Sequence, residues 1–247
     1  MAVPMTFPRP SRWLLGLEAP RATWEFGWFA AWAPAALLAP RGDGHTVLLL
    51  PGFMADDSST AALRMVLRAL GYDARGWGLG RNLGPTAPVV EGLVALVERG
   101  YAESGRPVSL VGVSLGGVFA REMARRHPER VRQVITLASP FRLPPRYSGP
   151  HDTHASSLYR SLGPMHEPQT VRTDAPLTVP TTAVYTRTDG IVPWESCLDE
   201  EGPTSENVEV WGSHCGIGHN PFALRVITDR LAQPAGSWAP YRAEKEN

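Results

Sequence analysis

The chain has 247 residues, of which 43% are hydrophobic, and its 24 basic and 24 acidic side chains cancel to a formal net charge of zero. This length and apolar content suffice for one large core, and no linker-like stretch divides the chain, so we expect a single domain over residues 1–247. The balanced charge, with no basic stripe, argues against nucleic-acid binding. We expect the arginines at positions 121, 125 and 126 on the solvated face of a helix.

The N-terminal segment, residues 1–40, is rich in proline and in tryptophan, which occurs at positions 13, 24, 28 and 32. Its apolar stretch 22–38 is interrupted by Glu25 and Pro34 and is too short for a membrane span. The first ten residues lack the basic start and apolar core of a secretory signal, which favours a cytoplasmic protein. We predict one or two helices or irregular chain packed on the domain, with a role at a membrane surface or beside the substrate as the alternative.

The motif Gly-Val-Ser-Leu-Gly occupies residues 112–116, between an apolar run and an amphipathic helical pattern. A serine between two glycines at such a junction is typical of a tight strand-to-helix turn that exposes the hydroxyl group. The following helix directs its N–H groups at the place where negative charge develops during attack on a carbonyl. The five residues alone often arise by chance, but an aspartate and then a histidine follow strand-like runs downstream. Ser114 is therefore predicted as a nucleophile.

The next strand is expected at residues 131–138, and the periodicity then breaks down over about 140–176. We interpret this stretch as a small lid insertion over the site. Its apolar residues are candidates for lining an acyl-binding cleft: Tyr147, Leu158, Tyr159, Leu162 and Met165. Its histidines, at positions 151, 154 and 166, do not have the spacing of metal ligands, so neither a metal nor an organic cofactor is predicted.

The acid candidate is Asp189, which follows a short strand-like run at 183–185. Asp-Gly is common turn chemistry in any protein, but the position of Asp189 between the serine and the histidine favours a catalytic role. Its rivals are Asp174, which precedes the strand, and three acidic residues on a segment that we expect to be solvated: Glu195, Asp199 and Glu200.

The base candidate is His214, directly after a last half-buried strand predicted at 208–211. The glycine-rich loop around it can fold back toward the serine. His219 lies one residue before Asn220-Pro221, which opens a helix with apolar residues at 222, 224, 226, 227 and 231. We therefore expect His219 to be an exposed or capping residue.

These pieces resemble the α/β-hydrolase superfamily, and more narrowly the bacterial lipase/esterase-type serine hydrolases. The resemblance rests on VLLLPGFM, VSLVGVSLGGVFAREMA, TRTDGIVPW and GSHCGIGHNP and spans roughly residues 46–234. It implies a mostly parallel central sheet flanked by helices, with Ser114 as nucleophile, Asp189 as acid and His214 as base. Many relatives carry His-Gly where this chain has Pro51-Gly52, a loop that supplies a backbone N–H rather than an imidazole.

The oxyanion of such a reaction needs two N–H donors. One is expected from Leu115, immediately after the nucleophile, and the other from Phe53, with Met54 as the fallback. Met54 is also a candidate for contact with the substrate.

The cysteines, Cys197 and Cys215, are expected on loops at one edge of the sheet, where a disulfide is geometrically reasonable and would indicate an oxidising compartment. The predicted function is hydrolysis of small-molecule or lipid-like carboxylic esters through an acyl-enzyme intermediate. The alternatives are an acyltransferase on the same triad and a catalytically silent binding protein on the same scaffold. The sequence leaves the oligomeric state open.

Overall fold

The computed structural model describes residues 7–142 and 176–242, and its centre is a sheet of six strands in the order β2-β1-β3-β4-β5-β6. All five neighbouring pairs are parallel. The strands are β1 Thr46–Leu50, β2 Asp73–Gly76, β3 Val108–Val113, β4 Val131–Leu137, β5 Thr181–Tyr185 and β6 Ser205–Glu209. The parallel order confirms the predicted α/β-hydrolase architecture. The carboxyl ends of the strands meet at one edge of such a sheet, which is where loops gather to form a site.

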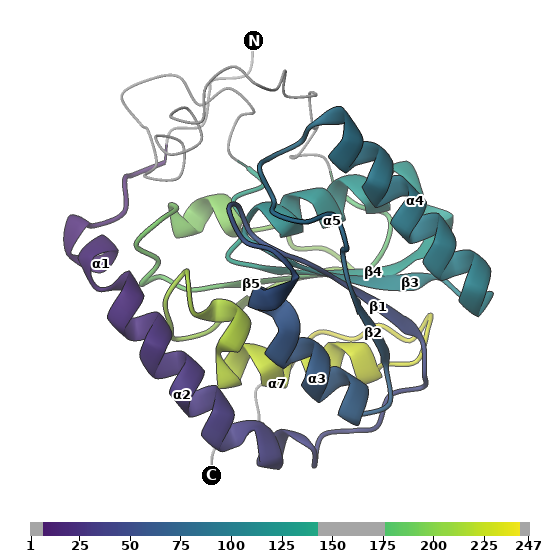
Figure 1. Cartoon of the computed structure of the whole chain (residues 1–247), viewed down its shortest axis with the longest axis horizontal. Coiled ribbons are helices and arrows are strands. Elements are labelled where there is room, and N and C mark those ends of the chain that lie inside the picture. The colour runs from purple at the N-terminus through teal and green to yellow at the C-terminus, as the bar shows by residue number, and fades with distance from the viewer. Residues whose placement is uncertain (1–6, 143–175, 243–247) are drawn as a thin grey trace.

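Helices cover both faces of this sheet (Figure 1). On one face lie α2, α3 and α7, and on the other lie α4 and α5. The helices are α1 Arg12–Gly16, α2 Glu18–Ala36, α3 Ala61–Ala69, α4 Ala87–Ser104, α5 Leu115–Arg126 and α7 Pro221–Ala232. Short 3₁₀ helices occur at η1 Asp57–Thr60, η2 Pro128–Arg130, η3 Trp194–Cys197 and η4 Ile217–His219.

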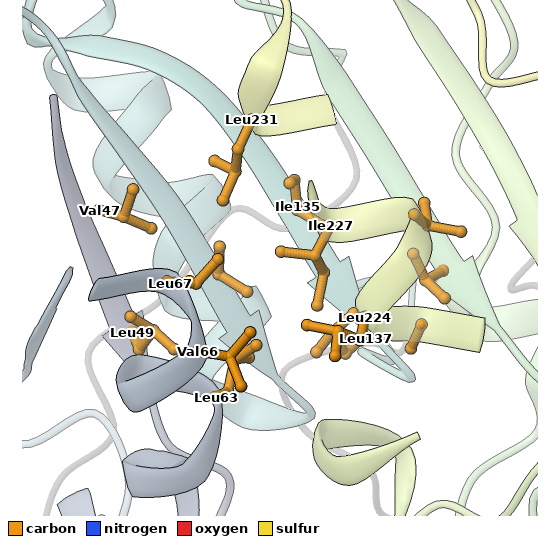
Figure 2. Close-up of a cluster of buried hydrophobic side chains, with 14 of the residues drawn as sticks. Val47, Leu49, Leu63, Val66, Leu67, Ile135, Leu137, Leu224, Ile227 and Leu231 are labelled. Carbon is orange, nitrogen blue, oxygen red and sulfur yellow. The ribbon is translucent and has the colours of Figure 1, made fainter. Parts of the chain in front are cut away.

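The core between the sheet and its α3/α7 face follows from the alternation of side chains along a strand. In β1, Val47 and Leu49 point to this face, whereas Leu48 and Leu50 belong to the cluster on the other side. Figure 2 shows the first pair beside α3 and, on the neighbouring part of the sheet, Ile135 and Leu137 of β4 beside α7. Each fully buried aliphatic side chain of this kind contributes about 1.5–3 kcal/mol. This packing holds the strand ends, and hence the site, in fixed relative positions.

The last strand differs from its predicted position. The sequence pattern indicated residues 208–211, whereas β6 spans Ser205–Glu209. Its register is set by the neighbouring β5, with Thr181 opposite Ser205 and Tyr185 opposite Glu209. Backbone pairing with β5 therefore outweighs the apolar alternation of residues 208–211, because an edge strand can begin in polar sequence.

The N-terminal helix α2 has an unusual distribution of side chains. Its buried residues include two carboxylates, Glu18 and Glu25, followed by Phe29 and Ala36 in the core. Its large exposed side chains are aromatic: Trp24, Phe26 and Trp32. The helix packs against α7 and η4 (Figure 1). Pro34 lies inside its last turn. None of the described helices is long and apolar enough to span a membrane.

Candidate active site

The turn between β3 and α5 has the geometry of a nucleophile elbow. Ser114 links the end of β3 to the first residue of α5 and adopts φ 50° and ψ −118°, a strained conformation for a residue with a side chain. Its side chain is only partly buried. The turn therefore presents a serine hydroxyl beside the N-terminus of a helix.

The glycines of the motif are required by close contacts. A Cβ atom on Gly112 would lie 2.3 Å from the amide nitrogen of Gly117, and one on Gly116 would lie 2.2 Å from the carbonyl oxygen of Leu50. Any side chain at either position would push α5 away from β3 or β1. The glycines thus allow the backbones to approach closely enough for the elbow to form.

The structure brings Ser114, His214 and Asp189 into one hydrogen-bonded chain. The Nε2 atom of His214 lies 3.0 Å from the hydroxyl oxygen of Ser114, and its Nδ1 atom lies 2.6 Å from Oδ2 of Asp189. These side chains come from the β3–α5 turn, the segment after β6 and the segment after β5. Residues separated by up to 100 positions in the sequence meet because all three segments leave the carboxyl edge of the sheet.

Asp189 is held in its orientation by its own turn. Its Oδ1 atom accepts hydrogen bonds from the N–H groups of Ile191 and Val192, each at 2.8 Å. Its other oxygen is thereby directed at His214. The carboxyl group is almost completely buried, so its charge acts on the imidazole with little screening by water.

The pKa of His214 is raised above its ordinary value. Burial alone would lower this pKa, but the negative charge of Asp189, its hydrogen bond, and the charge of Glu18 outweigh burial. Because the imidazolium is stabilised, His214 is a stronger proton acceptor than a free imidazole.

The rival residues have other surroundings. His219 is half-buried and Asn220 caps α7, so the expectation that His219 is exposed or capping is wrong. Its ring packs edge-on against Phe26 and Phe29, with centroid distances of 5.2 and 6.0 Å. Asp199 forms a salt bridge with Arg121, and both side chains are buried. The expectations that Asp199 lies on a solvated segment and Arg121 on a solvated helix face are therefore wrong. The attraction between the two charges compensates for the hydration that both lose on burial. Asp174 lies outside the described residues.

The loop after β1 lies beside the serine. A Cβ atom on Gly52 would be 3.4 Å from Cβ of Ser114. Asn82 holds this loop through two hydrogen bonds of 2.8 Å. Its side-chain amide donates to the backbone carbonyl of Pro51, and its backbone carbonyl accepts the N–H of Met54. Met54 has a left-handed φ of 63°. The hydrogen bond to Asn82 already engages the N–H of Met54, so this residue is not a ready fallback donor for an oxyanion.

The lid predicted from the sequence falls largely outside the described residues. The five apolar residues of the proposed lid, between Tyr147 and Met165, and the histidines at 151, 154 and 166 lie outside the described residues. Among residues 7–142 and 176–242, no three His, Cys, Asp or Glu side chains are grouped so that they could hold a metal ion.

The cysteines do not form the disulfide that their positions made reasonable. Both are free, Cys197 buried and Cys215 exposed. Burial raises the pKa of the Cys197 thiol well above its ordinary value, so this cysteine is an unreactive core residue.

Sequence reasoning missed one group at this edge of the sheet. Glu18 accepts hydrogen bonds from the backbone N–H groups of Gly190, His214 and Cys215, next to two of the three candidate catalytic residues. The available signal was three charged residues, Glu18, Arg21 and Glu25, in a largely apolar N-terminal helix, a pattern that does not identify their partners.

Comparisons with known proteins identify a family and a shared fold for this chain. A family described as "Putative esterase" matches residues 88–213, slightly more than half of the chain. Among solved structures, Aspergillus fumigatus lipase B has a TM-score of 0.57 at 18% identity over 78% of this chain. This chain spans about half (53%) of that lipase.

Two further structures are matched over most of their length. A monoacylglycerol lipase from Paleococcus ferrophilus has a TM-score of 0.55 at 15% identity, covering 78% of this chain and 96% of that protein. A pyrethroid hydrolase has a TM-score of 0.56 at 18% identity, covering 78% and 99%. These similarities establish the shared fold. The family match, over slightly more than half of the chain, shows that the chain belongs to this esterase family and is a carboxylic ester hydrolase.

Proposed function

We propose that this protein hydrolyses carboxylic esters by a serine mechanism, with Ser114 as nucleophile, His214 as general base and Asp189 as the acid that orients the base. The observation that carries the proposal is the continuous hydrogen-bonded chain from Asp189 through His214 to a serine on a strained strand-to-helix turn. A serine hydroxyl is a poor nucleophile near neutral pH and requires an adjacent base of this kind.

In the first half of the reaction, Ser114 Oγ attacks the ester carbonyl carbon while its proton moves to Nε2 of His214. The carbonyl π electrons move to oxygen and form a tetrahedral oxyanion. When the oxyanion collapses, the bond to the alcohol oxygen breaks, and the alcohol leaves with the proton held by His214. The acyl group remains on Ser114 as an ester.

In the second half, water takes the place of the alcohol. His214 accepts a proton from water as the water oxygen attacks the acyl carbon, and returns that proton to Ser114 Oγ when the carboxylic acid departs. Asp189 remains ionised throughout and stabilises the imidazolium that forms twice in each cycle. No step requires a metal or an organic cofactor.

The developing oxyanion is assigned to the backbone N–H groups of Leu115 and Phe53. The first residue of a helix has no intrahelical acceptor for its N–H group, and Leu115 is the first residue of α5. Phe53 lies in the loop that passes beside Ser114. Loss of one donor of this type reduces the rate by about 10²–10³-fold.

The experiment that tests this function compares two histidine variants on a series of nitrophenyl esters. His214→Ala should lose activity by about 10⁶-fold, because removal of either member of the serine–histidine pair stops activation. His219→Ala, the matched control, should retain most activity, since its ring packs against Phe26 and Phe29. Retained turnover in a folded His214→Ala variant would contradict the assignment.

The same assay defines the substrate. We expect short to medium acyl chains, with activity that first rises with chain length, by up to about 0.8 kcal/mol for each methylene that is buried. Unchanged activity in EDTA is expected. Product analysis with added alcohol separates hydrolysis from acyl transfer: a transesterified product in place of the free acid would identify an acyltransferase. Preference for long-chain triacylglycerols would contradict the proposed substrate class.

A further inference from the structure

We propose that Glu18, on the N-terminal helix α2, is a positioning residue that ties the loop of the catalytic acid to the loop of the catalytic base. The inference rests on the proposed triad and adds a fourth side chain that touches neither substrate nor the reacting atoms. It gives the N-terminal segment a role in a site whose acid and base loops lie in the C-terminal part of the sequence.

The contacts of Glu18 reach both loops at once. Its Oε1 atom accepts the N–H of Gly190, which follows the acid, at 2.8 Å, and the N–H of His214, the base, at 3.2 Å. Its Oε2 atom accepts the N–H of Cys215 at 2.9 Å. A single carboxylate oxygen thus joins the backbones of the two loops whose side chains meet through the Nδ1–Oδ2 hydrogen bond.

The burial of Glu18 shows that this arrangement is specific. The residue is only 4% exposed, and a buried carboxylate is costly unless it is paired and hydrogen-bonded. Here the three backbone N–H groups and the guanidinium of Arg21, at 2.8 Å, compensate for the lost hydration. Removal of the carboxylate would leave these buried N–H groups without an acceptor, so the loops would have to rearrange.

Two further side chains extend the contact along the same face of α2. Arg21 donates through both terminal nitrogens to the carbonyl of Thr188, each at 2.9 Å, immediately before the acid. Glu25 accepts the N–H of Ser213, immediately before the base, at 2.7 Å. The spacing 18, 21 and 25 places all three on one helix face, so α2 holds the acid loop at two backbone groups and the base loop at three.

The glycines of the two loops provide independent support. A Cβ atom on Gly190 would lie 2.5 Å from the carbonyl carbon of Leu14, and one on Gly216 would lie 2.7 Å from Oε2 of Glu25. Gly190 has no positive φ that would require glycine. Its lack of a side chain is required by the close approach of the N-terminal helices, which indicates that the loops and helices are fitted to one another.

The test uses Glu18→Gln, an isosteric change that removes the charge. Whichever way the amide is oriented, its NH₂ group faces at least one backbone N–H, so the loops lose at least one anchor. We expect kcat to fall by about 10-fold or more, because small displacements of catalytic groups have effects of this size, with KM changed far less. Glu18→Ala, which removes every acceptor, should cost more.

A matched control separates positioning from general stability. Glu206 is also a buried carboxylate, and it binds Thr182 and Arg230. It lies at the amino ends of β5 and β6, away from the candidate active site. Glu206→Gln should lower the melting temperature to a similar degree but leave kcat unchanged.

The pH profile is the readout that a purely structural role would not change. Asp189 and Ser114 face the ring of His214, and Glu18 with its partner Arg21 approaches from α2, beside Cys215. Because the charge of Glu18 favours the imidazolium, Glu18→Gln should shift the acid limb of kcat/KM, and the NMR titration of His214, to lower pH. Glu206→Gln should shift neither.

Each outcome has a defined meaning. Unchanged kcat and unchanged His214 titration in Glu18→Gln, or equal effects in both variants, would overturn the positioning role. If Glu18→Ala does not fold, the Gln variant carries the test alone. The NMR titration needs no substrate, so it also tests Glu18 if the assay with His214→Ala shows that the proposed catalytic mechanism is wrong.

Discussion

Two serines flank strand β3, Ser109 near its start and Ser114 directly after its end, and each is hydrogen-bonded to a histidine that contacts an aspartate. At the carboxyl end are Ser114, His214 and Asp189. At the other end, Ser109 lies 2.8 Å from Nε2 of His45, whose Nδ1 contacts Asp43. The two clusters have the same chemical groups in the same order, yet the surroundings suit only one of them for catalysis.

The difference begins with the backbone. Ser109 lies inside the strand and is completely buried, so no substrate can reach its hydroxyl. Ser114 lies on a strained turn, partly exposed, at the N-terminus of α5. A hydrogen-bonded triad is therefore insufficient; a nucleophile also needs an exposed turn and donors for the oxyanion.

The electrostatic surroundings of the two histidines also differ, and they favour a charged imidazole only at His214. Burial, together with Arg132 and Arg106, lowers the pKa of His45 despite the opposing effect of Asp43. Asp43 is 45% exposed and is shared with Arg132, whereas the side chain of Asp189 is 1% exposed and is directed at His214. The imidazolium is thus disfavoured at one end of β3 and favoured at the other.

The largest expected effect distinguishes the two serines. Ser114→Ala should reduce ester hydrolysis by about 10⁶-fold without loss of the fold. Ser109→Ala should retain activity but lose about 1–3 kcal/mol of unfolding free energy, because the buried Nε2 of His45 loses its partner. Steady-state kinetics and urea unfolding of both variants provide the measurement. Loss of activity in a folded Ser109→Ala variant would refute the contrast.

The two aspartates should differ by a smaller factor. Asp189→Asn should lower kcat by about 10⁴-fold, since the amide can favour the wrong tautomer of His214. Asp43→Asn should leave kcat near the wild-type value, because this residue lies at the other end of the sheet. Comparable losses in both variants would mean that the cluster of Ser109, His45 and Asp43 influences the reaction.

The smallest effect is a pH dependence of stability. His45 has a folded-state pKa below that of the unfolded chain, so the unfolded state binds more protons as pH falls through the unfolded value near 6.5. Its contribution to stability is therefore present above that pH and declines below it. His45→Gln should weaken the pH dependence of unfolding between about pH 7 and 5, measured by urea titration. An unchanged slope would contradict the shift.

His214 has the opposite linkage. The pKa of His214 is higher in the folded than in the unfolded chain. Its contribution to stability is therefore fully present below the unfolded-state pKa and is lost as pH rises through the folded-state pKa. The corresponding kinetic expectation is that activity falls as pH drops through the raised pKa, because only neutral imidazole accepts the serine proton. A pH-independent kcat/KM across this range would contradict the role of His214 as base.

The sequence predicted those parts of the site that depend on local backbone chemistry. The serine between Gly112 and Gly116 indicated the elbow, and the structure shows that neither glycine position has room for a side chain. Asp189 and His214 followed strand-like runs. The mostly parallel sheet was implied by the family resemblance, and the parallel pairing of the six described strands confirms it.

The remaining features depend on tertiary contacts that leave no local signal. Arg121 was expected in solvent, but it is buried because Asp199, 78 positions away, neutralises it. The burial of Glu18 is compensated by hydrogen bonds from backbone N–H groups of loops nearly 200 positions away in the sequence. The start of β6 is determined by its pairing with β5. In each case the partner, rather than the residue itself, determines the outcome.

The most direct test of the central claim is reaction with a fluorophosphonate probe, followed by mass spectrometric mapping of the modified peptide. The probe modifies a serine only where a base activates it and the active site admits the reagent. We predict one adduct, on Ser114, that is absent from Ser114→Ala and unchanged in Ser109→Ala. An adduct on another serine, or an active enzyme that the probe does not modify, would contradict the assignment.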